Sequence, residues 1–303
     1  MAALGLVALS ASAATEDRIE KTFSVGPGGK LVIDANVGSI EVKTSDRKDV
    51  HIDIARSAEA RGLLANGGSE EAELKANVVT FSQDGQTVIV HAERDKNAER
   101  QSRVNLKVRY TVSVPSQFTA DLKTSGGGIT VAGLNGELKA KTSGGSLKFA
   151  GINGPIDGRT SGGSITLTES TGSSELRTSG GSIKVLDHKG DVNARTSGGS
   201  INVERIEGNV RAITSGGSVN ALLTKAPTAD LRLETSGGGI TVGLPENTAA
   251  ELDALTSGGS VQSEIPLSSV EHKSRSSLKG KLNNGGAKLQ LRTSGGSIHV
   301  KKA

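Results

Sequence analysis

The sequence repeats the four residues Thr-Ser-Gly-Gly at a nearly fixed interval. The motif begins at Thr124 and returns every 18 residues, at Thr142, Thr160, Thr178, Thr196 and Thr214. Later copies begin at Thr235, Thr256 and Thr293, after intervals of 21, 21 and 37 residues. A unit this short cannot bury an apolar face alone, so neighbouring units must stack on one another. The repeat therefore predicts an elongated protein built from stacked copies of one element.

Apolar residues fall in columns when each unit is numbered from its Thr. Position six carries Ile129, Leu147, Ile165, Ile183, Ile201 and Val219, and position eight carries Val131, Phe149, Leu167, Val185 and Val203. Positions eleven, fifteen and seventeen are also mostly apolar. The pairs six with eight and fifteen with seventeen have the period of two that is typical of strands. Each unit is therefore expected to hold two short strands with alternate residues pointing inward.

These columns predict an all-β protein, a parallel single-stranded β-solenoid with about 18 residues per coil. Successive coils would lie ~4.8 Å apart, the spacing between paired strands. The inward columns do not follow the spacing of six that a left-handed hexapeptide helix needs, so we favour a right-handed β-helix.

The Gly residues of the motif are predicted to turn a tight corner at every coil, with a positive φ where the turn demands it. The predicted structural corner residues at position three are Gly126, Gly144, Gly162, Gly180, Gly198 and Gly216. Thr at position one has the inward parity of positions fifteen and seventeen. It should form an internal ladder of hydroxyl groups that bond to the corner backbone.

Three regions are expected along the 303 residues. Residues 1–14 contain a short apolar run followed by Ala11-Ser12-Ala13, the pattern of a signal peptide, without the usual basic residue near the start. Residues 15–123 hold alternating runs but no strict period, and are predicted to be a β-rich N-terminal cap. Residues 124–303 are predicted to be the solenoid with a C-terminal cap, closed at its end by the charged segment His299-Val-Lys-Lys-Ala303.

The segment Tyr110–Phe149, which includes "VPSQFTADLKTSGGGITVAGLNGELKAKTSGGSLKF", and the "TSGGSI" units after it resemble a known family. This is the exported bacterial β-strand-repeat family of unknown function that is often labelled "putative adhesin". The resemblance covers about residues 30–303. It implies a β-solenoid at the cell surface or in the periplasm, and it supplies no catalytic residues.

A ladder of basic residues precedes the motif in successive units. Its members are Lys123, Lys141, Arg159, Arg177 and Arg195. Stacked at the strand spacing, they would form a basic stripe able to contact an anionic envelope polymer, such as lipopolysaccharide or teichoic acid. The alternative is a solvated face that discourages lateral aggregation, and the nearby Asp157 and Glu175 favour that interpretation.

Glu169, Asp187 and His188 are the best catalytic candidates. Positions ten and eleven place Glu169 and Asp187 one coil apart, close to the ~5 Å separation of the carboxylates in a retaining glycosidase. No second acid–base cluster accompanies them, and the same residues fit a solvated turn. We therefore expect a protein that is not an enzyme.

Several classes of function lack their usual signals. The chain has no Cys, and its five His show no metal-ligand spacing, so neither a metal site nor a cofactor is predicted. Four Phe, one Tyr and no Trp leave little for stacking on bases, and the net charge of +4 is small, so nucleic acid is not an expected partner. No apolar run approaches the ~20 residues of a transmembrane helix.

The sequence thus favours a non-catalytic exported protein, periplasmic or at the cell surface, with a structural or adhesion-type role. The expected partner is an anionic envelope polymer or another envelope protein. Two alternatives stay open, a polysaccharide-active β-helix enzyme that uses Glu169 and Asp187, and a regulatory module that senses envelope stress through a protein partner.

Overall fold

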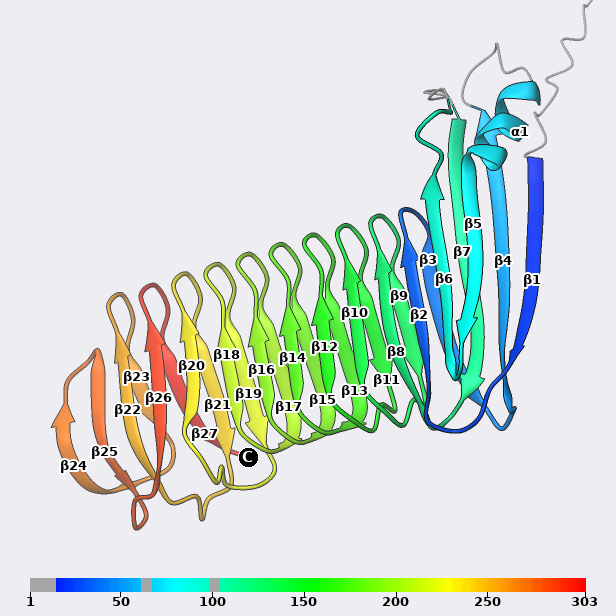
Figure 1. Ribbon diagram of the computed structural model, residues 1–303. Helices are drawn as coiled ribbons and strands as arrows, with labels where there is room; N and C mark the ends of the chain where they lie inside the picture. Colours follow the sequence, from blue (N-terminus) through cyan, green and yellow to red (C-terminus); the bar gives the residue numbers. More distant parts are fainter. Residues whose placement is uncertain (1–14, 61–66, 99–103) are drawn as a thin grey trace, which may run out of the picture.

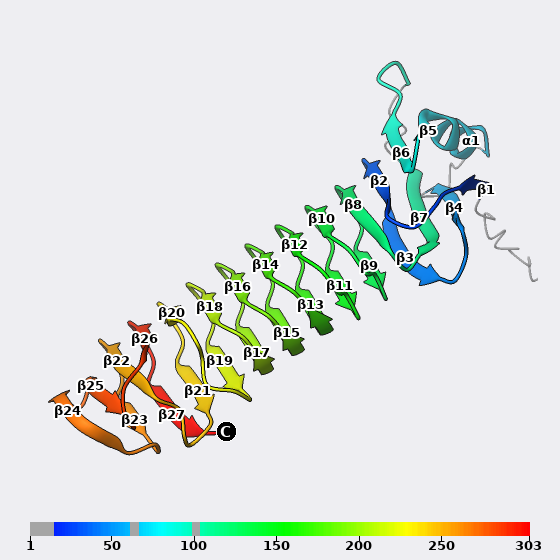
Figure 2. The same ribbon diagram turned by 60° about the horizontal axis from the view of Figure 1, so that its bottom comes forward.

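The computed structural model describes residues 15–60, 67–98 and 104–303. Their strands form two long sheets that face each other along a rod, with a taller cap at one end (Figures 1 and 2). Each coil places one strand in each sheet, so the chain alternates between the two layers. The predicted β-solenoid is confirmed.

We call the 13-stranded layer sheet A. Its spatial order is β1 (Thr15–Ser24), β4 (Asp49–Ala60), β7 (Val104–Pro115), β3 (Ser39–Ser45), β9 (Ile129–Ala132), β11 (Leu147–Ala150), β13 (Ile165–Thr171), β15 (Ile183–Lys189), β17 (Ile201–Glu207), β19 (Val219–Leu223), β21 (Ile240–Leu244), β27 (Ile298–Lys302) and β23 (Val261–Ser263).

The 14-stranded layer is sheet B. Its spatial order is β24 (Leu267–Lys273), β25 (Ser277–Leu282), β22 (Ala250–Thr256), β26 (Ala287–Thr293), β20 (Leu231–Thr235), β18 (Val210–Ile213), β16 (Val192–Arg195), β14 (Ser174–Arg177), β12 (Ile156–Arg159), β10 (Leu138–Thr142), β8 (Phe118–Thr124), β2 (Gly29–Ala35), β6 (Thr87–Arg94) and β5 (Asn77–Asp84).

Equivalent residues of successive coils lie directly over one another. Ile183 pairs in register with Ile165 on one side and with Ile201 on the other. The inward columns are buried in one continuous apolar core between the sheets. The Thr at the start of each motif is also buried. Since the core is thin and repeated, every coil is held mainly by its two neighbours.

The cap extends both sheets beyond the coils. β1, β4 and β7 continue sheet A, while β5 and β6 continue sheet B. Helix α1 (Gly67–Ala76) lies across the upper ends of these strands (Figure 1). The segment Gly29–Ser45, within the predicted cap region, forms the first coil, since β2 pairs with β8 and β3 with β9. The solenoid thus begins before residue 123, whereas residues 1–14, the predicted signal peptide, lie outside the described residues.

The last coil does not end the rod. Strands β26 and β27 lie between the coil of β20 and β21 and the coil of β22 and β23, so the chain turns back and fills a gap. The expectation that the C-terminal segment from His299 closes the rod is therefore wrong. Its end is formed by β23 and by the hairpin of β24 and β25, whose pairing is irregular at two points.

Candidate functional site

The upper corner of each coil is fixed by the Thr hydroxyl and by the second Gly of the motif. Thr178 Oγ1 donates a hydrogen bond of 2.7 Å to the carbonyl of Gly163 in the preceding coil, and it accepts one of 3.3 Å from the N–H of Gly181. A Cβ atom on Gly181 would lie 2.1 Å from the oxygen of Gly163. Equivalent Thr bonds recur along the rod. The corner is thus a hydrogen-bonded stack of backbone with no room for side chains at position four.

The predicted corner residues, Gly126, Gly144, Gly162, Gly180, Gly198 and Gly216, do lie in this corner. None has a positive φ, so backbone conformation does not explain them. A Cβ atom at position three would meet nothing within 4 Å at Gly126 and a carbonyl oxygen at 2.8 Å at Gly216. The tighter contact is at position four, which the sequence predicts as part of the corner together with position three. The identical "GG" in every copy was the available signal.

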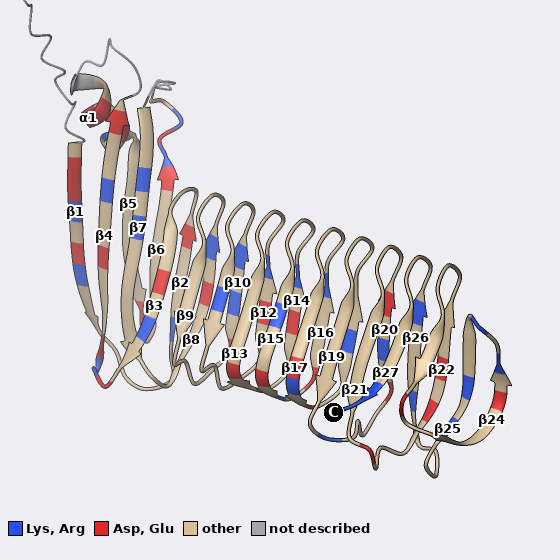
Figure 3. Ribbon diagram, turned by 180° about the vertical axis from the view of Figure 1, so that it is seen from behind, with Lys and Arg blue, Asp and Glu red and all other residues tan. Residues whose placement is uncertain are grey.

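The basic ladder is stacked as the sequence predicts. Lys123, Lys141, Arg159, Arg177 and Arg195 pair one after another across β8, β10, β12, β14 and β16. In Figure 3 it appears as blue segments near the corner ends of successive strands, with red segments beside several of them.

Three of the five ladder cations already have acidic partners. Arg159 makes a bidentate contact with Asp157, and Arg177 bonds to Glu175. Lys123 lies 3.1 Å from Asp34 of the neighbouring β2. Among the described residues, Lys141 and Arg195 form no ion pair. The ladder is therefore a largely neutralised face with two free cations.

Glu169 and Asp187 occupy equivalent places in the lower turns of adjacent coils. Both have a positive φ, of 50° and 52°, and so does Arg205 one coil further, at 55°. Arg205 holds the Asp187 carboxylate with two hydrogen bonds of 2.6 and 2.8 Å. These bonds lower the pKa of Asp187, so this carboxylate stays ionised and engaged.

His188 points into the core, away from the two carboxylates. Its side chain is completely buried, and neither ring nitrogen has a hydrogen-bond partner. It stacks between Ser170 and Ile206 of the adjacent coils. Burial lowers the pKa of His188, against a smaller opposite effect of backbone groups at Gly172 and Ser170. The structure therefore does not bring the three candidates together around one site.

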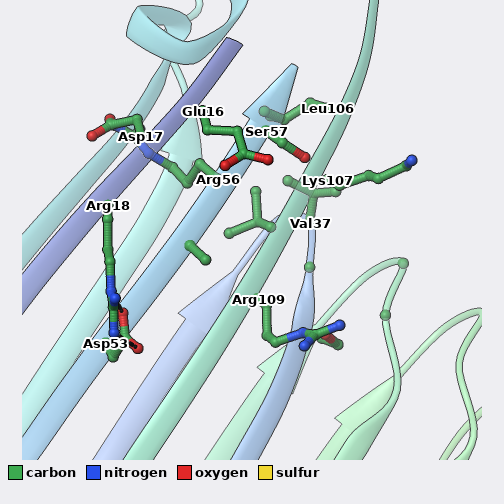
Figure 4. A pocket seen from close by; sticks show the side chains of 16 residues that line it. Glu16, Asp17, Arg18, Val37, Asp53, Arg56, Ser57, Leu106, Lys107 and Arg109 are labelled. Atoms are coloured by element: carbon green, nitrogen blue, oxygen red, sulfur yellow. Dashed lines mark hydrogen bonds and ion pairs between the residues drawn. The ribbon is translucent and has the colours of Figure 1, made fainter. Parts of the chain in front are cut away.

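A hollow of about 840 Å³ lies where the tall cap strands meet the first corners (Figure 4). Outward side chains of β1, β4 and β7 form one wall, and the corners around Gly38 and Gly126 form the other. The row from Glu16 through Ser57 to Lys107 lies next to the row from Arg18 through Ala55 to Arg109, as strand pairing requires. The small Ser57 and Ala55 thus lie between longer charged side chains.

Most charges of this hollow are paired. Arg18 makes two hydrogen bonds with Asp53, Arg56 bonds to Asp17, and Lys107 lies 3.4 Å from Glu59. Arg109 is exposed and forms no ion pair within the described residues; Figure 4 shows it beside the corners. This site could not be predicted from the sequence, because its residues come from five separate segments.

The described residues contain neither a cluster suited to a metal ion nor a helix suited to cross a membrane. In the described ranges, no group of three or more His, Asp or Glu side chains is placed to hold a metal ion. No helix in this part of the chain is long and apolar enough to cross a membrane.

The stacked coils and the recurring backbone corner define this chain as a β-solenoid repeat protein. The profile of the Toastrack family, DUF4097, matches residues 29–301. The chain belongs to this family, whose function is unknown, as its predicted resemblance implied. No curated protein matches the sequence.

Solved structures with a similar course of the chain have low sequence identity. A protein described as a "putative adhesin" from Parabacteroides distasonis is 11% identical, covers 94% of this chain and 97% of its own, and has a TM-score of 0.44. A "putative lipid binding protein" from the same species is also 11% identical with the same coverage and a TM-score of 0.42. A "putative adhesin" from Bacteroides fragilis is 13% identical, covers 95% of this chain and 97% of its own, and has a TM-score of 0.39.

Proposed function

We propose that this protein is a non-catalytic scaffold of the bacterial envelope, exported to the periplasm or the cell surface, with a structural or adhesion-type role. The observation that carries the proposal is the continuous register of the coils, which makes the chain a rigid wall with a fully packed interior. Such a wall presents repeated side chains at a fixed spacing, which suits weak contacts made many times.

The state of the candidate residues supports a role without catalysis. A retaining glycosidase needs one carboxyl group with a raised pKa to protonate the leaving group. Asp187 is instead held ionised by Arg205, and His188 lies inside the core. A screen for cleavage of envelope glycans checks this point, and activity that disappears in the double variant Glu169→Ala, Asp187→Ala would contradict it.

An anionic envelope polymer is the proposed partner of the sheet B face. Lys141 and Arg195 are the two ladder cations without ion pairs in the described chain, so they are the ones free to bind phosphate or carboxylate groups. Because the contact would be electrostatic, it should weaken as salt is raised.

The experiment is a sedimentation assay of the purified protein with whole cells, lipopolysaccharide and peptidoglycan. We expect saturable binding that Lys141→Glu with Arg195→Glu reduces several-fold. Lys148→Glu with Lys184→Glu, which makes the same change in net charge at exposed positions on the opposite sheet, is the matched control and should leave binding unchanged. Binding that both changes weaken equally would indicate attraction by net charge alone and would remove the ladder from the proposal.

A further inference from the structure

The hollow beside the cap contains a stretch of open strand edge. β7 pairs with β4 over Val104–Ser113, but with β3 only from Arg109 onward. Within the described residues, the segment Val104–Val108 therefore has a strand partner on one side only, and its residues Leu106–Val108 line the hollow. Unpaired strand edges are ready templates for a further strand.

The backbone groups of this edge point toward the hollow. A Cβ atom on Gly38 would lie 2.7 Å from the carbonyl oxygen of Val108, so that carbonyl faces the corner. Because successive residues of a strand direct their backbone groups to opposite sides, those of Leu106 face the hollow as well. They are placed to bond with an incoming strand.

At the same hollow, the Gly at position three of the motif has a backbone N–H that stays unused in the first corner of the described chain. In later coils this N–H donates to the Ser carbonyl one coil below, as Gly144 does to Ser125 and Gly162 to Ser143. Gly126 is the first of the series, and it forms no such bond in the described part of the chain. Both the strand edge and the first corner thus present unused backbone groups to the hollow.

We propose that this hollow binds an extended peptide segment of another protein by adding it to sheet A along Val104–Val108. Its side chains would alternate between the two faces of the sheet. On the outer face they would lie beside Lys107 and Arg109, and on the inner face beside Leu106 and Val37. The segment that fits is therefore about five residues long, with acidic and apolar residues in alternation. The site does not use the basic ladder, so its test is independent of polymer binding.

The probe is a fluorescent peptide of alternating Glu and Val, with blocked ends, titrated with the full chain and followed by anisotropy. We expect saturable binding, and weaker binding of the Lys–Val and Glu–Ser counterparts, which lose the charge match and the apolar contacts respectively. Arg109→Glu should weaken binding of the Glu–Val peptide about tenfold or more. Lys148→Glu, an exposed change on β11, three strands from β7 in the same sheet, is the matched control and should have no effect.

A backbone variant separates strand addition from charge attraction. Leu106→Pro removes an N–H that β4 does not use, so it should abolish binding while the circular dichroism spectrum is unchanged. If this variant does not fold, Arg109→Glu and its control decide the question. Equal affinity for the Glu–Val and Lys–Val peptides, or an unchanged affinity in Arg109→Glu, overturns the proposal. So does binding of an acidic polysaccharide in place of the peptide, or a dimer in the absence of peptide that Arg109→Glu dissociates.

Discussion

The two turns of each coil obey different rules. The upper corner keeps Thr-Ser-Gly-Gly in coil after coil, whereas the lower turn places Gly133, Gly151, Glu169, Asp187 and Arg205 at one equivalent position. At the upper corner the backbones of adjacent coils touch, so a Cβ atom added at position four collides. At the lower turn the side chain points to solvent, and the shared requirement is a positive φ. Sequence identity across repeats therefore marks contact between backbones, and does not by itself mark a binding site.

The largest effect should come from adding one carbon atom at the upper corner. Gly181→Ala places a Cβ atom 2.1 Å from the Gly163 carbonyl oxygen, which forces two coils apart. We expect a loss of about 3 kcal/mol or more in the free energy of unfolding, measured by chemical denaturation. Gly126→Ala, where nothing lies within 4 Å, is the control and should change stability by less than ~0.5 kcal/mol. Similar losses in both would show that close approach is not the constraint.

The corner hydroxyl should contribute less than the corner glycine. Thr178→Val keeps the side-chain shape but removes the donor to Gly163, leaving a buried carbonyl without that bond. The expected cost is about 1–3 kcal/mol in the same assay. In the lower turn, the exposed Thr171 hydroxyl donates to Asn153 Oδ1 at 3.0 Å, and Thr171→Val should cost under ~0.5 kcal/mol because water replaces the bond. Equal costs would erase the difference between the two turns.

The buried His188 should make the stability of the folded chain depend on pH. Its pKa is lowered in the folded chain, so below the ordinary value of 6.5 the unfolded chain binds a proton that the folded chain does not. Stability is therefore complete above that pH and falls on acidification, by at most about 1.4 kcal/mol per pH unit from this group. Melting temperatures at pH 7.5 and pH 5 should differ less in His188→Leu than in the wild type. His272→Gln, at an exposed position of β24, is the control, and the same pH dependence in all three proteins would rule out His188 as the cause.

The smallest effect should come from relieving the backbone strain of a residue with positive φ in the lower turn. Glu169→Gly removes a side chain from a residue with φ of 50°, and we expect stabilisation of about 0.5–1 kcal/mol, since the relief exceeds the added freedom of the unfolded chain. The reverse change, Gly151→Ala at φ of 63°, should destabilise by ~1 kcal/mol. Thermal denaturation of the two variants measures both. Stabilisation by the Ala variant would contradict the requirement for a positive φ.

Most of the coil was predictable because its signals are local. Alternation at positions six and eight, or fifteen and seventeen, reports which side chains enter the core, and the buried columns agree. The inward Thr ladder followed from the same parity. The reason for the Gly pair was only half predicted, since the sequence shows that Gly is required without showing whether φ or close contact requires it.

The candidate sites were less predictable, because they depend on partners from distant segments. The stacking of Lys123 to Arg195 followed from the period, but the pairing of Lys123 with Asp34 required the first coil to be placed beneath it. Position eleven was predicted to face inward, as His188 does, but strict alternation after Val185 would also have placed Asp187 inward. The positive φ of Asp187 breaks that alternation and leaves its carboxylate outside. The hollow at Arg109 exists because β7 is longer than β3, which pairs with it.

The sequence by itself determined the coil, its inward faces and its corners, because each of these depends on residues a few positions apart. The tertiary structure alone decided the order in which the last coils stack, with β27 between β21 and β23 in sheet A and β26 between β20 and β22 in sheet B. The physical reason is that the motif makes every coil a suitable neighbour for every other, so local pattern cannot select among them. Only the hairpin of β24 and β25, which turns the chain back, makes that selection.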